Sequence, residues 1–127
     1  MGTTIKNARD FSSPYLYRND SARTLIYQIT SAPSDVYGWN IINQNSGSVY
    51  VKFVDLASSG DVVVGTTQVE MTILVPGLTT VFLGNPVRAG SSMRQFDRGI
   101  NFYLTTGLAD TNTSIPTLNT LVEIYYR

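Results

Sequence analysis

Two glutamates come nearest to a catalytic pair in this chain. Glu70 and Glu123 both fall on segments of alternating apolar and polar residues, at positions predicted to face outward. Two carboxylates facing one cleft suffice for glycoside hydrolysis, and these two would approach each other if their strands were neighbours. Nothing in the sequence places either acid in the desolvated pocket that a general acid needs. We favour the alternative, in which both are solvated strand positions that discourage edge pairing.

Residue types exclude most other catalytic chemistry. The chain has no histidine and no cysteine, so Ser-His-Asp sites, Cys-His sites and the common zinc sites cannot be built. Ser48 and Lys52 lack the spacing of a Ser-Lys nucleophile, and no nucleotide-binding glycine loop is present. The segment from Asp110 to Ser114 spaces its oxygens like part of a calcium loop but lacks the closing glutamate. We therefore predict no enzymatic activity, no metal and no cofactor.

One predicted loop, residues 85–99, concentrates positive charge. It contains Arg88, Arg94 and Arg98, with Asp97 as its only acid. One interpretation is a solvated loop that charge keeps soluble. The other is a docking loop for an acidic partner surface, because the planar guanidinium group binds carboxylates bidentately.

Aromatic residues gather near the N-terminus, in a stretch without a clear strand pattern. Phe11, Tyr15 and Tyr17 lie within residues 1–22, which we predict to be an extended arm that packs on its own domain or on a neighbour. Exposed aromatic rings fill protein interfaces or stack on sugar rings. Phe11, Tyr15 and Tyr17 are therefore candidate interface residues together with the three arginines, and Trp39 is predicted to be a core residue.

The rest of the chain is patterned for β-strands. Its apolar residues recur with a period of two, in segments rich in Val, Ile, Thr, Tyr and Phe, and no segment offers three turns of a helical stripe. Seven strands are predicted, at Arg23–Thr30, Trp39–Asn43, Val49–Asp55, Val69–Val75, Thr79–Leu83, Ile100–Thr105 and Leu121–Tyr126. Each has one apolar face and one face that tolerates water. This pattern predicts an all-β, antiparallel β-sandwich of jelly-roll type, with seven to eight strands, as a single domain over residues 23–127.

Two turns can be predicted from their residues. Asn45-Ser46-Gly47 is short enough to close a hairpin, and Pro76-Gly77 fits a type II turn with a positive φ at the glycine. Longer loops are expected at 56–68, 85–99 and 107–119, and loops of this length are usually functional or disordered.

Composition limits the class of partner. The 127 residues carry nine basic and nine acidic side chains, and only 14% of residues are charged, against roughly 25% in soluble domains. A role on nucleic acid or on a membrane surface is not expected from this balance. A surface of low charge and near-zero net charge favours association with itself or with a partner.

Residues 39–127 resemble a group of small all-β proteins encoded by tailed bacteriophages. The similarity rests on WNIIN, VYVKFVD, VGTTQVEMTILVPG, Phe82, FDRGINFYLTTGLADTNTS and the terminal VEIYYR. Residues 1–38 lie outside it, the loop 85–99 is longer and more basic than the pattern, and Gln68 stands where a proline is common. The last two departures bear on the attachment surface rather than on the fold.

The resemblance implies a virion component made in the host cytoplasm. On it we expect a capsid decoration or cement subunit at the capsid surface, a dimer or trimer whose partner is the major capsid protein or another virion protein. The alternative is a tail or fibre accessory protein that binds carbohydrate.

Overall fold

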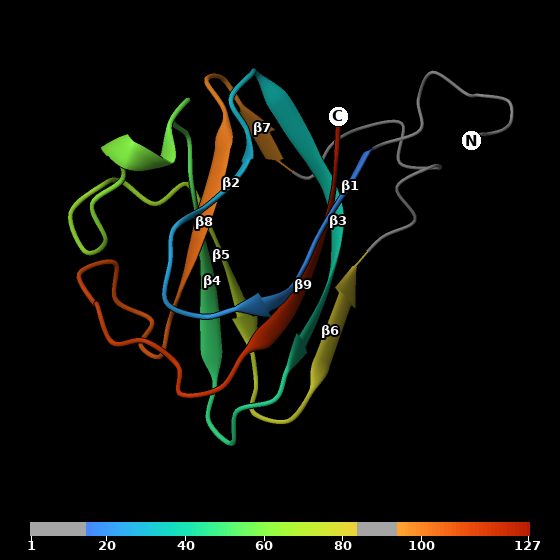
Figure 1. The fold of residues 1–127 in the computed structure, drawn as a ribbon, viewed down its shortest axis with the longest axis vertical. Helices are drawn as coiled ribbons and strands as arrows, with labels where there is room; N and C mark the ends of the chain where they lie inside the picture. The colour runs from blue at the N-terminus through green and yellow to red at the C-terminus, as the bar shows by residue number, and fades with distance from the viewer. Residues whose placement is uncertain (1–14, 84–93) are drawn as a thin grey trace, which may run out of the picture.

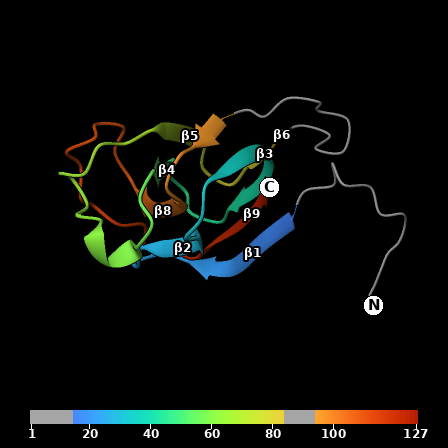
Figure 2. The ribbon, with the colours of Figure 1, turned by 90° about the horizontal axis from the view of Figure 1, so that it is seen from above.

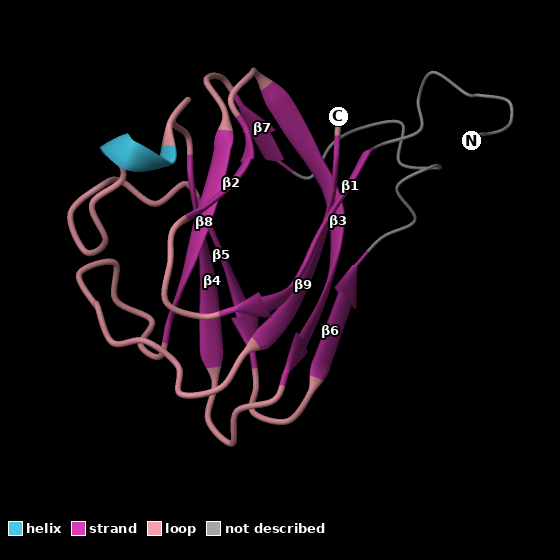
Figure 3. Cartoon of the chain, in the orientation of Figure 1, coloured by secondary structure: helices cyan, strands magenta, loops and turns pink. Residues whose placement is uncertain are grey.

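The computed structural model describes residues 15–83 and 94–127, which form nine strands and one short 3-10 turn, η1 (Ser59–Asp61) (Figures 1 and 3). The strands are β1 (Tyr15–Ala22), β2 (Tyr27–Thr30), β3 (Ser34–Asn43), β4 (Val49–Val54), β5 (Met71–Val75), β6 (Thr80–Leu83), β7 (Arg94–Phe96), β8 (Ile100–Thr105) and β9 (Thr120–Tyr126). Within these two ranges no helix is long and apolar enough to cross a membrane.

The strands form two antiparallel sheets that pack against each other (Figure 2). Sheet A has the order β1-β9-β3-β6, with β7 also paired to β3, and sheet B has the order β2-β8-β4-β5. The all-β antiparallel sandwich is thus confirmed, with nine strands instead of seven to eight. Four of the seven described strand pairs are nested along the chain: β1 with β9, β2 with β8, β3 with β7, and β4 with β5.

The core lies between the sheets and follows the predicted alternation. Its buried residues come from both inner faces: Ala22, Val36, Ile41, Val49, Val51, Phe53, Ile73, Val75, Phe96, Ile100, Phe102, Leu104, Val122 and Ile124. Phe102 is central, since its ring contacts Tyr17, Tyr27 and Phe53 at centroid distances of 5.7, 5.2 and 5.8 Å. Trp39 packs against this core, as predicted.

The outer face of sheet B is covered along β4 and β8, which the alternation did not predict, whereas Leu74 on the edge strand β5 is 49% exposed. Lys52 and Tyr103, expected on a water-tolerant face, are 0% and 2% exposed. Two long loops, residues 56–70 and 106–119, lie beyond this sheet (Figures 1 and 2), and Tyr103 packs with Val54 and Val62 in a second apolar cluster. The Lys52 ammonium donates to the Ala109 carbonyl at 2.5 Å. Burial lowers the pKa of Lys52, against the opposing effect of Asp110.

Two segments expected to be irregular contribute strands to sheet A. Residues 15–22, placed in the arm, form β1 and pair with β9 from Tyr15↔Tyr126 to Ala22↔Thr120. Residues 94–96, placed in the loop 85–99, form β7 and pair with the first residues of β3. The arm expected over 1–22 is thus corrected: the sandwich begins by residue 15, and residues 1–14 lie outside the described part.

The hairpin expected at Asn45-Ser46-Gly47 is wrong, because β3 and β4 lie in different sheets. This connection crosses from one sheet to the other, and the buried amide of Asn43 fixes it. The Asn43 Nδ2 donates to the carbonyls of Gly47, Val75 and Pro76 at 2.9, 3.0 and 3.2 Å. Its Oδ1 accepts from the backbone and side-chain amides of Asn45 at 2.8 and 3.0 Å.

The Pro76-Gly77 turn also differs from its prediction. The positive φ falls on Leu78, at 56°, and not on Gly77. Gly77 is required for a different reason: a Cβ there would lie 2.0 Å from the Ser46 carbonyl oxygen. The glycine therefore permits close approach of two connections, while the strained conformation belongs to a leucine that is 72% exposed.

Candidate partner interface

The outer face of sheet A is the most extensive uncovered sheet surface in the described part of the chain. We call it the sheet A face, and its outward side chains come from β1, β9, β3 and β6: Leu16, Arg18, Ile42, Asn40, Thr80, Phe82, Leu121, Glu123 and Tyr125. The two largest exposed apolar groups are Phe82, 62% exposed, and Leu16, 51% exposed. No described loop lies beyond this face in Figure 2.

A polar network holds the centre of the sheet A face. Arg18 donates to Glu123 Oε2 at 2.6 Å, and Asn40 Nδ2 donates to Glu123 Oε1 at 3.0 Å. The three residues are aligned across β1, β9 and β3. The hydrogen bond from Asn40 lowers the pKa of Glu123 most, burial opposes it, and Arg18 lowers it further. The carboxylate is thus fully partnered within the chain, with its side chain only 13% exposed.

The register of β1 decides which of its residues a partner would meet. Tyr17, a candidate interface residue, turns inward, where its ring packs edge-on against Phe102, and burial raises its pKa. Tyr15 lies on the same side of the strand; its ring is 5.6 Å from that of Tyr126, yet it remains 63% exposed. The outward positions are Leu16 and Arg18, which the sequence reasoning missed. The alternation of Leu16, Arg18 and Asp20 was the available signal.

The structure gives the described arginines acidic neighbours within the chain. Arg94 forms an ion pair with Glu70 at 2.5 Å. Arg98 lies in the turn after β7, where the carboxylate of Asp55 accepts the amides of Asp97, Arg98 and Gly99 at 2.9, 2.7 and 3.3 Å. Burial would raise the pKa of Asp55, but these amides and the Arg98 charge lower it.

Phe11 and Arg88, the other two candidates, lie outside the described residues. The positive charge at Arg94 is already neutralised by Glu70. A docking loop that depends on three free arginines is therefore less favoured than the sequence implied.

Several candidate segments meet at one end of sheet A. One row of paired residues crosses four strands at this end: Tyr15 of β1, Tyr126 of β9, Val36 of β3 and Arg94 of β7. Leu83, the last described residue of β6, pairs with Trp39 on the same strand as Val36. Tyr15 and Arg94, the described residues that follow the intervals 1–14 and 84–93, therefore lie at this end, which we call the attachment end.

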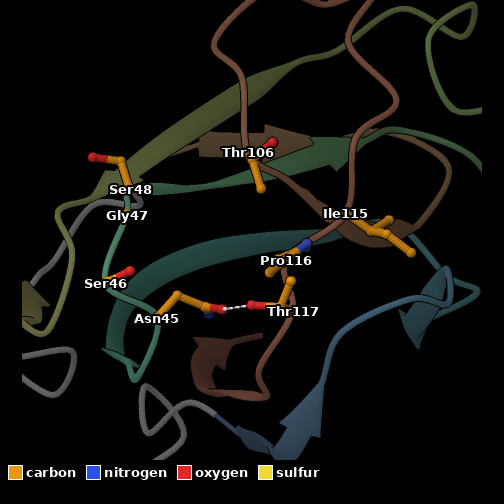
Figure 4. Close-up of a pocket in the computed structure, with 8 residues that line it drawn as sticks. All are labelled: Asn45, Ser46, Gly47, Ser48, Thr106, Ile115, Pro116 and Thr117. Carbon is orange, nitrogen blue, oxygen red and sulfur yellow. Dashed lines mark hydrogen bonds between the residues drawn. The ribbon is translucent and has the colours of Figure 1, made fainter.

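The opposite end of β3 carries a small, open hollow (Figure 4). Its volume is about 210 Å³, and it lies between the β3–β4 crossover and the loop that precedes β9. It is lined by Asn45, Ser46, Gly47, Ser48, Thr106, Ile115, Pro116 and Thr117. None of these side chains is charged.

The residues first considered for catalysis are not brought together. Glu70 immediately precedes β5 of sheet B, whereas Glu123 lies in the middle of β9 of sheet A, and each has its own arginine. In the segment from Asp110 to Ser114, Asn112 Oδ1 accepts the amides of Gly107 and Ser114 at 3.2 and 3.1 Å, which closes the loop on itself. Residues 15–83 and 94–127 hold no group of three acids that could bind a metal.

No family model, no curated protein sequence and no solved structure matches this chain. The fold and its surfaces define a class only: an antiparallel β-sandwich in which loops cover much of sheet B, whereas no described loop covers the outer face of sheet A.

Proposed function

We propose that this chain is a non-enzymatic structural protein of a bacteriophage virion, a decoration or cement subunit that binds the major capsid protein and stabilises the head. The observation that carries the proposal is the sheet A face, where Leu16 and Phe82 are exposed on a rigid four-stranded support. The attachment end borders this face, so the intervals 1–14 and 84–93 can contribute to the same contact. The similarity to phage proteins supplies the virion context.

The strand order supports the jelly-roll interpretation on which the proposal draws. Nested pairing from β1·β9 inward to β4·β5 is that of one long hairpin rolled into two sheets. Consecutive strands change sheet at β1 to β2, β2 to β3, β3 to β4, β5 to β6, β7 to β8 and β8 to β9. Jelly rolls recur in viral capsid and lectin domains, so this topology is compatible with a shell protein and does not by itself name a partner.

A partner could cover the sheet A face without leaving a buried charge unpaired. A buried carboxylate destabilises an interface when it lacks partners, but Glu123 already has Arg18 and Asn40. Around this network, Leu16, Phe82 and Tyr125 offer apolar area, and each fully buried large side chain contributes roughly 1.5–3 kcal/mol. Such contacts across capsomer boundaries would stabilise the head, since shell subunits could separate only by breaking them as well.

A matched pair of substitutions tests the proposal. Leu16 on β1 and Leu74 on β5 are both edge-strand leucines, 51% and 49% exposed, but on different sheets. Binding to shells purified from phage lacking the protein is measured by co-sedimentation. Leu16→Asp should weaken binding at least tenfold, or about 1.4 kcal/mol, and Leu74→Asp should leave it unchanged. Equal effects of the two substitutions, or no binding by the wild type, would contradict the proposal.

A truncation tests the part played by the N-terminal residues. Removing residues 1–14 leaves β1 in place, so the β-sheet circular dichroism spectrum should be retained while shell binding falls. Removing residues 1–22 also deletes β1 and uncovers the edge of β9, and should therefore destabilise the fold itself. Full shell binding by the shorter truncation would remove residues 1–14 from the contact.

Self-association is expected to accompany this role. We expect a dimer or trimer because charge is sparse and the net charge is zero. Light scattering of the purified protein gives the mass directly. If the protein is a monomer at all concentrations, the sheet A face would contact only other virion proteins.

A further inference from the structure

We propose that the hollow at the β3–β4 crossover is a binding site for one neutral, hydroxyl-rich ring, that is, a single sugar residue. Its volume of about 210 Å³ limits the ligand to a small molecule. No charged side chain lines the hollow, so neither an anionic nor a cationic ligand would be favoured there.

The hollow is held open by hydrogen bonds behind its lining. Asn45, 7% exposed, clamps the backbone of Leu118 from both sides: its Nδ2 donates to the Leu118 carbonyl at 3.2 Å, and its Oδ1 accepts the Leu118 amide at 2.8 Å. Asn43 holds Asn45 in turn. On the far wall, the amide of Thr106 donates to the Ser114 carbonyl at 2.9 Å. Both walls are therefore fixed before a ligand arrives, which reduces the entropy lost on binding.

The lining has the chemistry that a sugar ring requires. Hydroxyl groups both donate and accept, and four of the lining residues carry one: Ser46, Ser48, Thr106 and Thr117 (Figure 4). The Thr117 hydroxyl already donates to Asn45 Oδ1 at 3.5 Å, and the Ser48 hydroxyl points away from the other lining residues. Ile115, 46% exposed, adds an apolar surface for the C–H side of a ring. The lining has no aromatic ring, so binding would rest on hydrogen bonds, with affinity in the millimolar range expected for so small a ligand.

The position of the hollow would leave it accessible on a particle; this step alone rests on the proposed function. The hollow follows the last residue of β3, whereas Arg94 and Tyr15 of the attachment end are aligned with Val36 near its beginning. Seven residues of strand separate Val36 from Asn43, or about 23 Å at 3.3 Å per residue. A subunit bound through the part of the sheet A face nearest its attachment end would leave the hollow uncovered.

The test uses the full-length protein alone, so its result does not depend on shell binding. Amide chemical shifts are followed by NMR while glucose, galactose, mannose or N-acetylglucosamine is added, with sorbitol as a non-cyclic control. At least one sugar should give saturable shifts at residues 46–48, 106, 115 and 117, and sorbitol should not. Thr106→Val should weaken that binding at least fivefold, whereas the same change at the exposed Thr66, on another loop, should not alter it.

Three results would overturn the proposal. These are no saturable shifts with any of the four sugars at 100-fold excess, equal shifts with sorbitol, or unchanged affinity in Thr106→Val. The co-sedimentation experiment fails or succeeds separately, so loss of shell binding with retained sugar binding would reject the virion role and not this site.

Discussion

Asn43→Ala should be among the most destabilising single substitutions in the chain. Asn43 is 2% exposed, and its amide makes five hydrogen bonds to the crossover and to the end of β5. After truncation, the carbonyls of Gly47 and Pro76 can turn to water, because both residues are partly or fully exposed. The Asn45 amide and the Val75 carbonyl cannot, since their residues are buried.

The expected loss of stability follows from these two buried groups, which lose their hydrogen-bond partner. A buried polar group left without its partner costs about 1–3 kcal/mol, so the substitution should reduce the free energy of unfolding by about 2–6 kcal/mol. Urea denaturation measures this quantity, and with a slope of about 1.5 kcal/mol per molar urea the midpoint should fall by at least about 1.3 M. Asn40→Ala, which removes one partly exposed hydrogen bond to Glu123, should cost only about 1 kcal/mol or less.

A third variant separates hydrogen bonding from simple loss of volume. Asn43→Asp keeps the shape and the acceptor oxygen, but near neutral pH it places a carboxylate among three carbonyls. It should be at least as destabilising as Asn43→Ala at pH 7 and recover in part as the acid is protonated. A loss below about 1 kcal/mol for Asn43→Ala would refute the account of how the crossover is fixed.

Three further predictions concern single residues. The lowered pKa of Glu123 means that its stabilisation is present above the unfolded value of about 4.3 and is lost as pH falls through the folded value. In urea titrations Glu123→Gln should therefore be less stable than wild type at pH 7, and the difference should shrink as the pH is lowered below the unfolded value. Asp55→Ala removes the acceptor of three amides and should lower the free energy of unfolding by about 1–3 kcal/mol. Amide hydrogen exchange at residues 97–99 should become faster. Unchanged exchange there would show that the carboxylate does not hold this turn. Leu78→Asn should raise the melting temperature by about 2–4 °C, since asparagine tolerates the left-handed conformation that leucine adopts here. A lower melting temperature would mean that the exposed leucine stabilises the fold through its contacts.

The fold class could be predicted because burial is encoded locally. Val51, Phe53 and Phe102 alternate with other residues on strands that have one face toward the core, and a period of two is visible without knowing the neighbours. Whether the other face is wet is not local. Lys52 looks like a solvated residue in its own segment, yet it is covered by a loop whose Ala109 lies 57 positions away.

Strand pairing and register lay beyond the sequence for a related reason. The alternation of apolar and polar residues does not reveal which sheet a strand joins. Asn45-Ser46-Gly47 therefore suggested a hairpin at a point where the chain crosses from one sheet to the other. The short segment that holds β1 has polar residues on both faces, so its outward leucine, Leu16, was missed in favour of Tyr17. The ion pair of Arg94 was not predicted because its partner, Glu70, lies 24 positions away.

The most direct test of the proposed function is cryo-electron microscopy of virions purified from cultures that produce the chain. We predict density for the sandwich on the capsid surface, with Leu16 and Phe82 of the sheet A face buried against the shell and the β3–β4 crossover left uncovered at the edge of the contact. Absence of the sandwich from the particle, or attachment through the covered face of sheet B, would contradict it.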